Sequence, residues 1–119
     1  MALKRAILEL GSGNDLHGDD YTKAALRAVQ DALHHSSLAF VRSLGLDINT
    51  IQVEVTIGVQ KPEAVDREAV KASLPRGQVS VKVVKGGLDV PREDQHDSVV
   101  IAAAAIAVRF EPGSGKASG

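Results

Sequence analysis

The chain contains no cysteine and no tryptophan, and its only aromatic residues are Tyr21, Phe40 and Phe110. Without cysteine, disulfide bonds, thiolate metal sites and cysteine nucleophiles are excluded. With so few aromatic rings, the chain offers almost no platform on which nucleic-acid bases could stack. The net charge of −1 also lacks the excess of Lys and Arg on which binding to nucleic acid rests. We therefore expect no nucleic-acid partner.

Long apolar runs are missing as well. The longest, residues 99–108, is too short to cross a bilayer as a helix, which needs about 20 residues. Lys4, Arg5 and Glu9 interrupt the apolar stretch after the first residue, so no signal peptide fits there. These features predict a cytoplasmic protein with no membrane partner. We expect one α/β domain over residues 1–110 and a disordered tail rich in Gly and Ser over residues 111–119.

The spacing of apolar residues predicts four strands and two helices. Apolar residues recur at helical spacing in a segment that Asp19 or Asp20 could cap and that extends to about Ala39. In chain order, we expect a strand at 3–10, this helix, a strand at 51–59, a second helix at 62–73, a strand at 79–85, a polar loop at 88–97 and a strand at 99–108. The order β-α-β-α-β-β predicts an α/β fold of the α+β two-layer sandwich type, a mixed four-stranded sheet with both helices on one face.

The last predicted strand, residues 99–108, is apolar at every position. A strand that is apolar on both faces is normally covered on both faces. Because two helices cover only one side of a four-stranded sheet, the other side is expected to meet another copy of the chain. Small alanines in this strand would let that copy approach closely. We therefore predict a homo-oligomer, with the alternative of an edge strand whose small side chains tolerate water.

Residues 11–20, with the sequence GSGNDLHGDD, gather three glycines, three aspartates and a histidine. Their place between a strand and a helix predicts a tight polar turn, where ligand sites often form. Gly13 and Gly18 have the spacing of a phosphate-binding loop. However, Asp19 and Asp20 stand where that loop has Lys and Ser or Thr, and two carboxylates at a helix N-terminus would repel a phosphate.

Two kinds of chemistry fit this turn. Asp15, His17 and Asp19 alternate in a way that could hold a divalent metal ion, with Glu9 or His96 to complete the site. Alternatively, His17 could transfer protons with its ring oriented by Asp15, because its ordinary pKa lies near neutrality. A purely structural alternative is that the aspartates bond to the local backbone, as they commonly do in turns.

Further residues could contribute to such a site. Gly11, Gly13 and Gly18 would let a ligand approach the backbone closely. Lys85 could bind an anion at the end of its strand, and Asp89, in a loop that follows Gly86 and Gly87, could reach the turn of a neighbouring subunit. On the polar side of two strands, Glu54 and Lys82 either pair with other charges or line a pocket between subunits.

The same segment resembles a family of conserved hypothetical proteins, the Lin-type family, marked by the motif G-x-G-x-D-x-H-G near the N-terminus. All five motif positions match, at Gly11, Gly13, Asp15, His17 and Gly18, and the resemblance extends over nearly the whole chain except the tail. The family has no established activity, so the resemblance implies none.

The predicted fold is also similar to that of the small trimeric chorismate mutases. This resemblance implies a chorismate mutase-like architecture, a trimer and ligand pockets between subunits. Their activity is not implied, because a dicarboxylate needs arginine clamps. Glu9, Leu10 and Ser98 stand where such arginines would be expected.

Two functions remain open from the sequence. The first is a protein that binds a small molecule or a metal at the 11–18 turn within a homo-oligomer, and that acts as an enzyme through His17 and Asp15. The second is a non-catalytic assembly module whose turn shapes a subunit interface.

Overall fold

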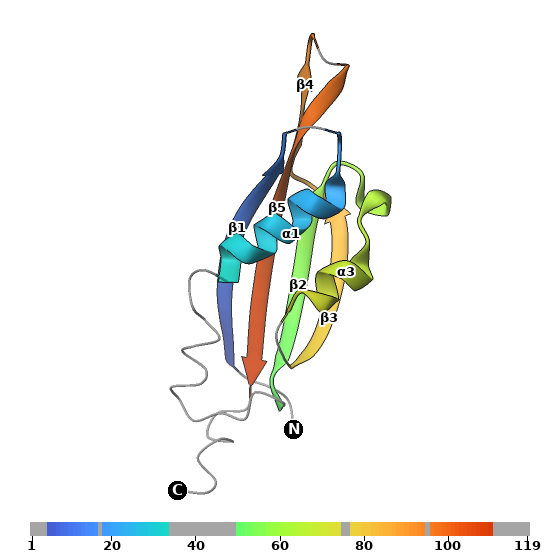
Figure 1. Cartoon of the computed structure of the whole chain (residues 1–119). Coiled ribbons are helices and arrows are strands. Elements are labelled where there is room, and N and C mark those ends of the chain that lie inside the picture. Colours follow the sequence, from blue (N-terminus) through green and yellow to red (C-terminus); the bar gives the residue numbers. More distant parts are fainter. Residues whose placement is uncertain (1–4, 17, 34–49, 75–76, 95, 111–119) are drawn as a thin grey trace, which may run out of the picture.

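The computed structural model describes residues 5–16, 18–33, 50–74, 77–94 and 96–110 (Figure 1). These residues form a mixed sheet covered by helices on one face. In chain order the elements are β1 (Arg5–Asp15), α1 (Tyr21–Leu33), β2 (Gln52–Val59), the 3-10 helix η2 (Pro62–Ala64), α3 (Arg67–Ala72), β3 (Gln78–Lys85), β4 (Leu88–Arg92) and β5 (Asp97–Phe110). The α+β class expected from the sequence is confirmed.

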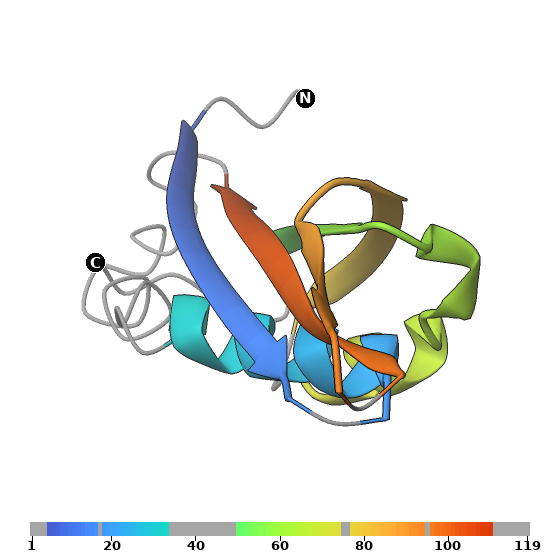
Figure 2. The ribbon, with the colours of Figure 1, turned by 90° about the horizontal axis from the view of Figure 1, so that it is seen from above.

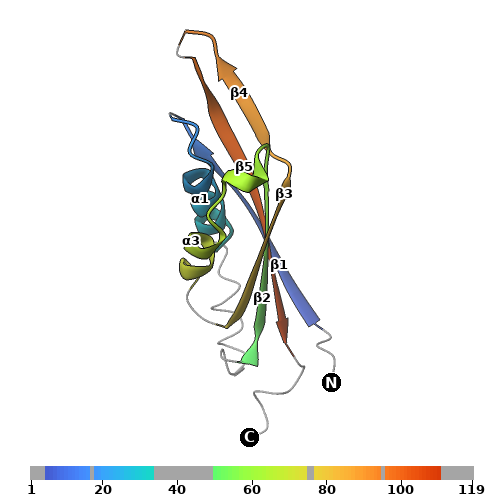
Figure 3. The ribbon, with the colours of Figure 1, turned by 90° about the vertical axis from the view of Figure 1, so that its right-hand side faces the viewer.

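The long strand β5 organises the sheet. Its neighbours are β1 on one side and β2 on the other, both antiparallel to it, and β3 lies beyond β2 and parallel to it, which gives the order β1-β5-β2-β3. A parallel pair needs a crossover, and η2 and α3 supply it between β2 and β3. Figures 2 and 3 show α1 and α3 on the same side of the twisted sheet.

The expectation of four strands is wrong, because the predicted loop at 88–97 contains a fifth strand, β4. It pairs antiparallel with β5 from Leu88 opposite Ile101 to Arg92 opposite Asp97. The polar residues of this segment indicated a loop. Pro91 lies within the strand, where a proline is tolerated because an edge strand can lack an N–H without breaking a ladder. β4 thus forms a hairpin with the start of β5, and this hairpin extends past both helices (Figures 1 and 3).

Gly86 and Gly87 let the chain cross from β3 to the position that β4 occupies. The pairing of β2 with β5 ends at Gly58, and β4 continues along β5 from that point. A Cβ atom on Gly87 would lie 2.1 Å from the carbonyl oxygen of Ile101, and the φ of Gly87 is +61°. The crossing is also held by Gln60, whose side-chain amide donates to the carbonyl oxygens of Gly86 and Gly87 at 3.1 Å.

The core lies between the helices and one face of the sheet. Alternate residues of β2 and β5 point into it and are buried, which explains the strict period of two in both strands. α1 meets them with small residues at helical spacing. The buried members of these three elements are Tyr21, Ala24, Ala25, Ala28, Val29, Ala32, Val53, Val55, Ile57, Val59, Val100, Ala102, Ala104, Ile106, Val108 and Phe110.

The opposite face of the sheet has no cover from the described part of the chain, and we call it the open face. The side chains of Leu8 and Leu10 lie on it, 61% and 62% exposed. In register with them across β5 are Ala107 and Ala105, followed by Glu54 and Thr56 of β2. β5 is therefore apolar on both faces, as its sequence indicated, and the residues that the structure describes cover only one of them.

Other element boundaries also differ from expectation. β1 runs to Asp15 rather than ending at residue 10, and the second predicted helix is divided into η2 and the short α3. The division occurs at Asp66, whose side chain accepts from the N–H of Ala69 and so caps α3. The expected extension of the first helix to Ala39 and the tail at 111–119 lie outside the described residues. None of the helices that the structure describes is long and apolar enough to cross a membrane.

Candidate functional site

Gly11 and Gly13 belong to β1, so the prediction of a turn that begins at residue 11 is wrong. A Cβ atom on Gly11 would lie 2.4 Å from the backbone nitrogen of Ala32, and one on Gly13 would lie 2.3 Å from that of Ala28. The two glycines thus face α1 and let its backbone pack directly on the strand. Their place in the sequence has a packing reason, and neither presents an open backbone to a ligand on that side.

Asp15 and Asp20 join the end of β1 to the start of α1. Asp15 is buried, with 2% exposure, and its Oδ2 accepts the backbone N–H of Asp20 at 2.9 Å. The Nζ of Lys23 lies 3.8 Å from its Oδ1 and balances its charge. Asp20 caps α1, because its Oδ1 accepts the N–H of Lys23 at 3.0 Å. Both carboxylates therefore satisfy the backbone at a strand-to-helix junction, as the structural alternative from the sequence proposed.

The loop between these two aspartates is tied to the β4–β5 hairpin. Asp19, with a φ of 51°, accepts the N–H of Ser98 at 2.8 Å. In the other direction, Asp97 accepts the N–H of Gly18 at 3.4 Å, and Arg92 donates to the carbonyl oxygen of Leu16 at 2.9 Å. The guanidinium of Arg92 also lies 3.7 Å from the carboxylate of Asp97. The loop and the hairpin therefore hold one another in place.

Tyr21, the first residue of α1, connects the helix to β4. Its hydroxyl donates to Oδ2 of Asp89, while Oδ1 of Asp89 is buried without a hydrogen-bond partner among the described residues. The sequence suggested that Asp89 could reach the turn of a neighbouring subunit. In the structure it contacts Tyr21, beside the turn of its own chain. Burial, the hydrogen bond to Asp89 and the nearby negative charges of Asp89, Asp19 and Glu63 raise the pKa of Tyr21 well above its ordinary value.

This shift gives a spectroscopic prediction, because Tyr21 is the single tyrosine of the chain. In an alkaline titration, the phenolate absorbance should stay absent beyond about pH 11, where a free tyrosine is mostly ionised. The unfolded chain ionises near its ordinary pKa and the folded chain does not. The contribution of Tyr21 to stability is therefore full below about pH 10 and is lost as the pH rises further.

Asp89→Asn should lower the midpoint of that titration, because it removes the negative charge beside the hydroxyl. It should not return the midpoint fully to the ordinary value, since burial is the largest cause of the shift. Asp94→Asn, at the exposed end of the hairpin, is the matched control and should leave the titration unchanged. A wild-type midpoint near pH 10 in protein that is still folded by circular dichroism would show that the contact is absent.

The predicted metal site is only partly visible. Among the described residues, no three acidic or histidine side chains gather to hold a metal ion. His17 lies outside these residues, so its roles as a ligand and in proton transfer remain predictions. Asp15 and Asp19 are engaged by the backbone groups of Asp20 and Ser98. Lys85 ends β3 as an exposed residue, and no ion pair to it is seen in the described part of the chain.

Of the two strand charges that the sequence singled out, Glu54 pairs with a neighbour. Its Oε2 lies 3.0 Å from the Nε of Arg109 on β5. Lys82 is exposed on the open face, beside Thr56 in the register of β2 and β3. The sequence left open whether Glu54 pairs with another charge or lines a pocket between subunits. The structure shows the pairing.

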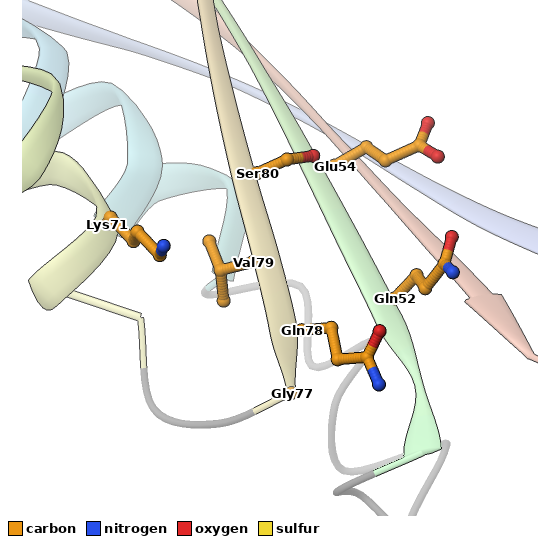
Figure 4. A pocket seen from close by; sticks show the side chains of 7 residues that line it. All are labelled: Gln52, Glu54, Lys71, Gly77, Gln78, Val79 and Ser80. Carbon is orange, nitrogen blue, oxygen red and sulfur yellow. The ribbon is translucent and has the colours of Figure 1, made fainter.

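The hollows on the sheet away from the turn include two of different character. One, of about 500 Å³, surrounds the free edge of β3 at its start (Figure 4). Its polar side chains come from both sides of that strand, because Gln78 and Ser80 lie on the open face and Lys71 belongs to α3. It is thus a groove around an edge. The other, of about 330 Å³, lies on the open face and is lined by Leu10, Gly11, Thr56, Gly58, Val84, Ala103, Ala104 and Ala105.

A family model described as "Conserved hypothetical protein (Lin0512_fam)" matches residues 5–108, which is most of the chain. The chain belongs to this family. The match includes β1, α1 and the loop between them, where the family resemblance was noted from the sequence. No curated protein matches the chain.

A crystal structure with the same fold comes from Nostoc punctiforme, and it is described as an FtsZ-like protein of unknown function. It shares 39% sequence identity with this member of the family, with a TM-score of 0.81. The alignment covers 93% of this chain and 98% of that one. The relationship therefore holds over the whole domain, and both comparisons describe proteins of unknown function.

Sequence reasoning missed three residues that shape this region: Tyr21, Arg92 and Asp97. Tyr21 precedes Ala24 and Ala25 by three and four residues, so helical periodicity could have placed it on the buried face of α1. Arg92 and Asp97 act only because β4 and β5 form a hairpin, which the sequence did not predict. No local signal could have shown that they reach the loop at residues 16–18.

Proposed function

We propose that this protein is an assembly subunit, a homo-oligomer in which sister chains cover the open face of the sheet. The apolar character of that face carries the proposal. Leu8 and Leu10 lie more than half exposed beside the alanines of β5, and Val84 is 39% exposed across the sheet. Contiguous apolar surfaces of this kind on a small domain mark sites of protein–protein contact.

The partner that fits this face best is a second copy of the chain. In its middle, the central strand presents small side chains there, Ala103, Ala105 and Ala107, so another sheet or strand can approach closely. Near the end of β5, the Nε of Arg109 lies 3.0 Å from Oε2 of Glu54, so these two charges neutralise one another. A face with an apolar centre, one internal ion pair and the further charge of Lys82 can approach its own copy without strong repulsion.

The contacts of the turn favour assembly over catalysis. Asp15, Asp19 and Asp20 each accept a backbone N–H, and two of these bonds position the loop against the next element. A carboxylate used in this way maintains the shape of the surface around it. Metal binding by Asp15, His17 and Asp19, ligand binding by Gly11, Gly13, Gly18, Lys85 and Asp89, and proton transfer by His17 remain predictions.

The finer proposal is a closed trimer with a chorismate mutase-like arrangement. The trimer is supported by the architecture, because a mixed sheet with helices on one face leaves the other face for contacts around a symmetry axis. A head-to-tail contact closes into a ring when its rotation permits, and three copies are a common result. A cytoplasmic location is part of the same proposal and rests on the sequence.

Ala103→Glu tests the proposed function. Ala103 is exposed at the middle of the open face, so a single chain accommodates the longer side chain in solvent. In an assembly the carboxylate would be buried without a partner, at a cost of about 3 kcal/mol, which corresponds to roughly 100-fold weaker association. Light scattering should then show the variant at the mass of one chain, 12.5 kDa, at concentrations where the wild type is a multiple of it.

Ala72→Glu is the matched control. Ala72 is also an exposed alanine, but it ends α3 on the helical side of the sheet. This variant should keep the mass of the wild type. If Ala103→Glu also keeps that mass, the open face is not the surface through which the copies associate, and the proposal is wrong.

A further inference from the structure

The β4–β5 hairpin continues the open face beyond the body of the molecule. Leu88 and Val90 are 59% and 44% exposed on it, and they stand opposite Ile101 and Val99 in the register of the two strands. All four side chains therefore lie on one face. We call this hairpin, β4 together with the part of β5 that pairs with it, the arm. Figure 3 shows that neither helix covers its length.

An apolar two-stranded ribbon is only marginally stable in water without a surface to pack on. The contacts that hold the arm to its own chain are polar, and they run from Asp89 near its base to Arg92, Asp97 and Ser98 near its tip. They include Tyr21 with Asp89 and Asp19 with the N–H of Ser98. Nothing in the described part of the chain covers Leu88 and Val90. A surface that packs against these two side chains would therefore stabilise the arm.

The open face of the body carries a hollow that suits such side chains. This hollow, which we call the trough, has a volume of about 330 Å³, and its floor is formed by small residues such as Gly58, Ala103 and Ala105. Leu10 and Val84 stand at its sides. The arm thus offers large apolar side chains with no cover, and the trough offers an apolar space that no side chain of the described chain fills.

The charges of the two surfaces are complementary as well. The tip of the arm carries Glu93 and Asp94, both exposed, while Lys82 is exposed next to the trough in the row that contains Thr56 and Ala105. The distance from Val90 to the tip is about 13 Å, at 3.3 Å per residue. The distance from the middle of β5 to β3 is about 10 Å, which is two strand spacings. An arm lying in a trough can therefore place its acidic tip beside the lysine.

We propose that the arm of one copy lies in the trough of a second copy, with Val90 and Leu88 packed over Ala103 and Ala105 and the acidic tip beside Lys82. The inference rests on the proposed function, because it names the surfaces through which the copies associate. Every chain carries one arm and one trough. Arms donated in sequence around a ring give a closed cyclic assembly, and arms exchanged between two copies give a dimer.

The absence of cysteine allows a direct test by cross-linking. The double variant Val90→Cys with Ala103→Cys places one thiol on the arm and one in the trough of each chain. Val90 faces Val99, and Ala103 lies four residues further along β5, or about 13 Å, which is too far for a disulfide within one chain. Oxidation, or a short bismaleimide reagent, should convert most of the double variant into covalent dimers and higher multimers on a denaturing gel.

The single variants Val90→Cys and Ala103→Cys are the controls and should remain mostly at the mass of one chain. If the double variant forms no more multimer than they do, while its native mass is still a multiple of 12.5 kDa, the arm does not lie in the trough and only the proposed function stands. If the native mass is that of one chain, both proposals fail.

Lys82→Glu examines the charge contact separately. It should weaken association by about tenfold, because like charges would face one another at the tip. Combining it with Glu93→Lys should restore most of the lost affinity. Equal affinity of wild type and Lys82→Glu would contradict the proposed register of arm and trough.

Discussion

Replacing Gly13 with alanine is expected to destabilise the fold severely, by about 3 kcal/mol or more. The new methyl group would lie 2.3 Å from the backbone nitrogen of Ala28 and 2.6 Å from the carbonyl oxygen of Ala24. Backbone atoms of a packed helix cannot move aside as the end of a side chain can. α1 would have to separate from β1, which would open the core along the length of the helix.

Thermal unfolding measures this effect at a fixed protein concentration, and the midpoint should fall by roughly 10 °C or more. Ser12→Ala is the control, because Ser12 is the adjacent residue of the same strand and its exposed side chain lies on the open face. That variant keeps the backbone N–H of residue 12, which donates to Asp31 at 2.9 Å, and should unfold like the wild type. A Gly13→Ala protein as stable as Ser12→Ala would contradict the close packing of α1 on β1.

Gly87→Ala is the second substitution with a large expected effect. Its Cβ atom would lie 2.1 Å from the carbonyl oxygen of Ile101 and 2.9 Å from that of Gly58, at a φ of +61° that suits glycine. The loss should reach about 3 kcal/mol, from the overlap and the strained backbone together. Because the overlap involves β5 where β4 begins to pair, the pairing of the arm should weaken first.

Gly18→Ala separates the two causes. Gly18 also has a positive φ, +83°, but a Cβ atom there would meet nothing within 4 Å. It should therefore show the backbone strain alone, about 1 kcal/mol. Unfolding in urea compares the two variants, and hydrogen exchange in β4 shows whether the arm is released. Equal losses of stability for Gly87→Ala and Gly18→Ala would mean that Gly87 does not pass as close to the carbonyl oxygens of Ile101 and Gly58 as the structure shows.

Period-two alternation made β2, β3 and β5 predictable from the sequence. These strands have one face in the core, so every second residue is apolar, and for β5 the other face is apolar too. The apolar spacing from Ala24 to Leu33 likewise predicted α1, and the cap at Asp20 was one of the two alternatives. Local pattern sufficed for these elements because their burial repeats along the chain.

The residues that the sequence misplaced are those whose role depends on a distant element. Gly11 and Gly13 looked like turn residues, since nothing local shows that a helix backbone lies 2.3–2.4 Å from their missing side chains. The polar residues of 88–97 did not indicate β4, which is a strand because it pairs along the edge of β5, where a proline such as Pro91 is acceptable. The sequence predicted a candidate site near Asp15, and that site remains a prediction. However, the contacts of Asp19 with Ser98 and of Asp89 with Tyr21 depend on a hairpin more than 65 residues away in sequence.

The doubly apolar strand β5 remains the feature from which the functional account follows. Its helical side is filled by α1 and the core, and its other side presents alanines between Leu10 and the row of β2. A contiguous apolar surface of this kind is typical of an interaction site. We propose that copies of the same chain cover this surface, and that the arm of one copy contacts the trough of another.

Sedimentation equilibrium of the wild-type protein at micromolar concentration tests this claim most directly. We expect a mass of two or more times 12.5 kDa, with a trimer at three times that value. A single species at 12.5 kDa over the whole concentration range would contradict it, because the open face would then be exposed to water in the working form of the protein.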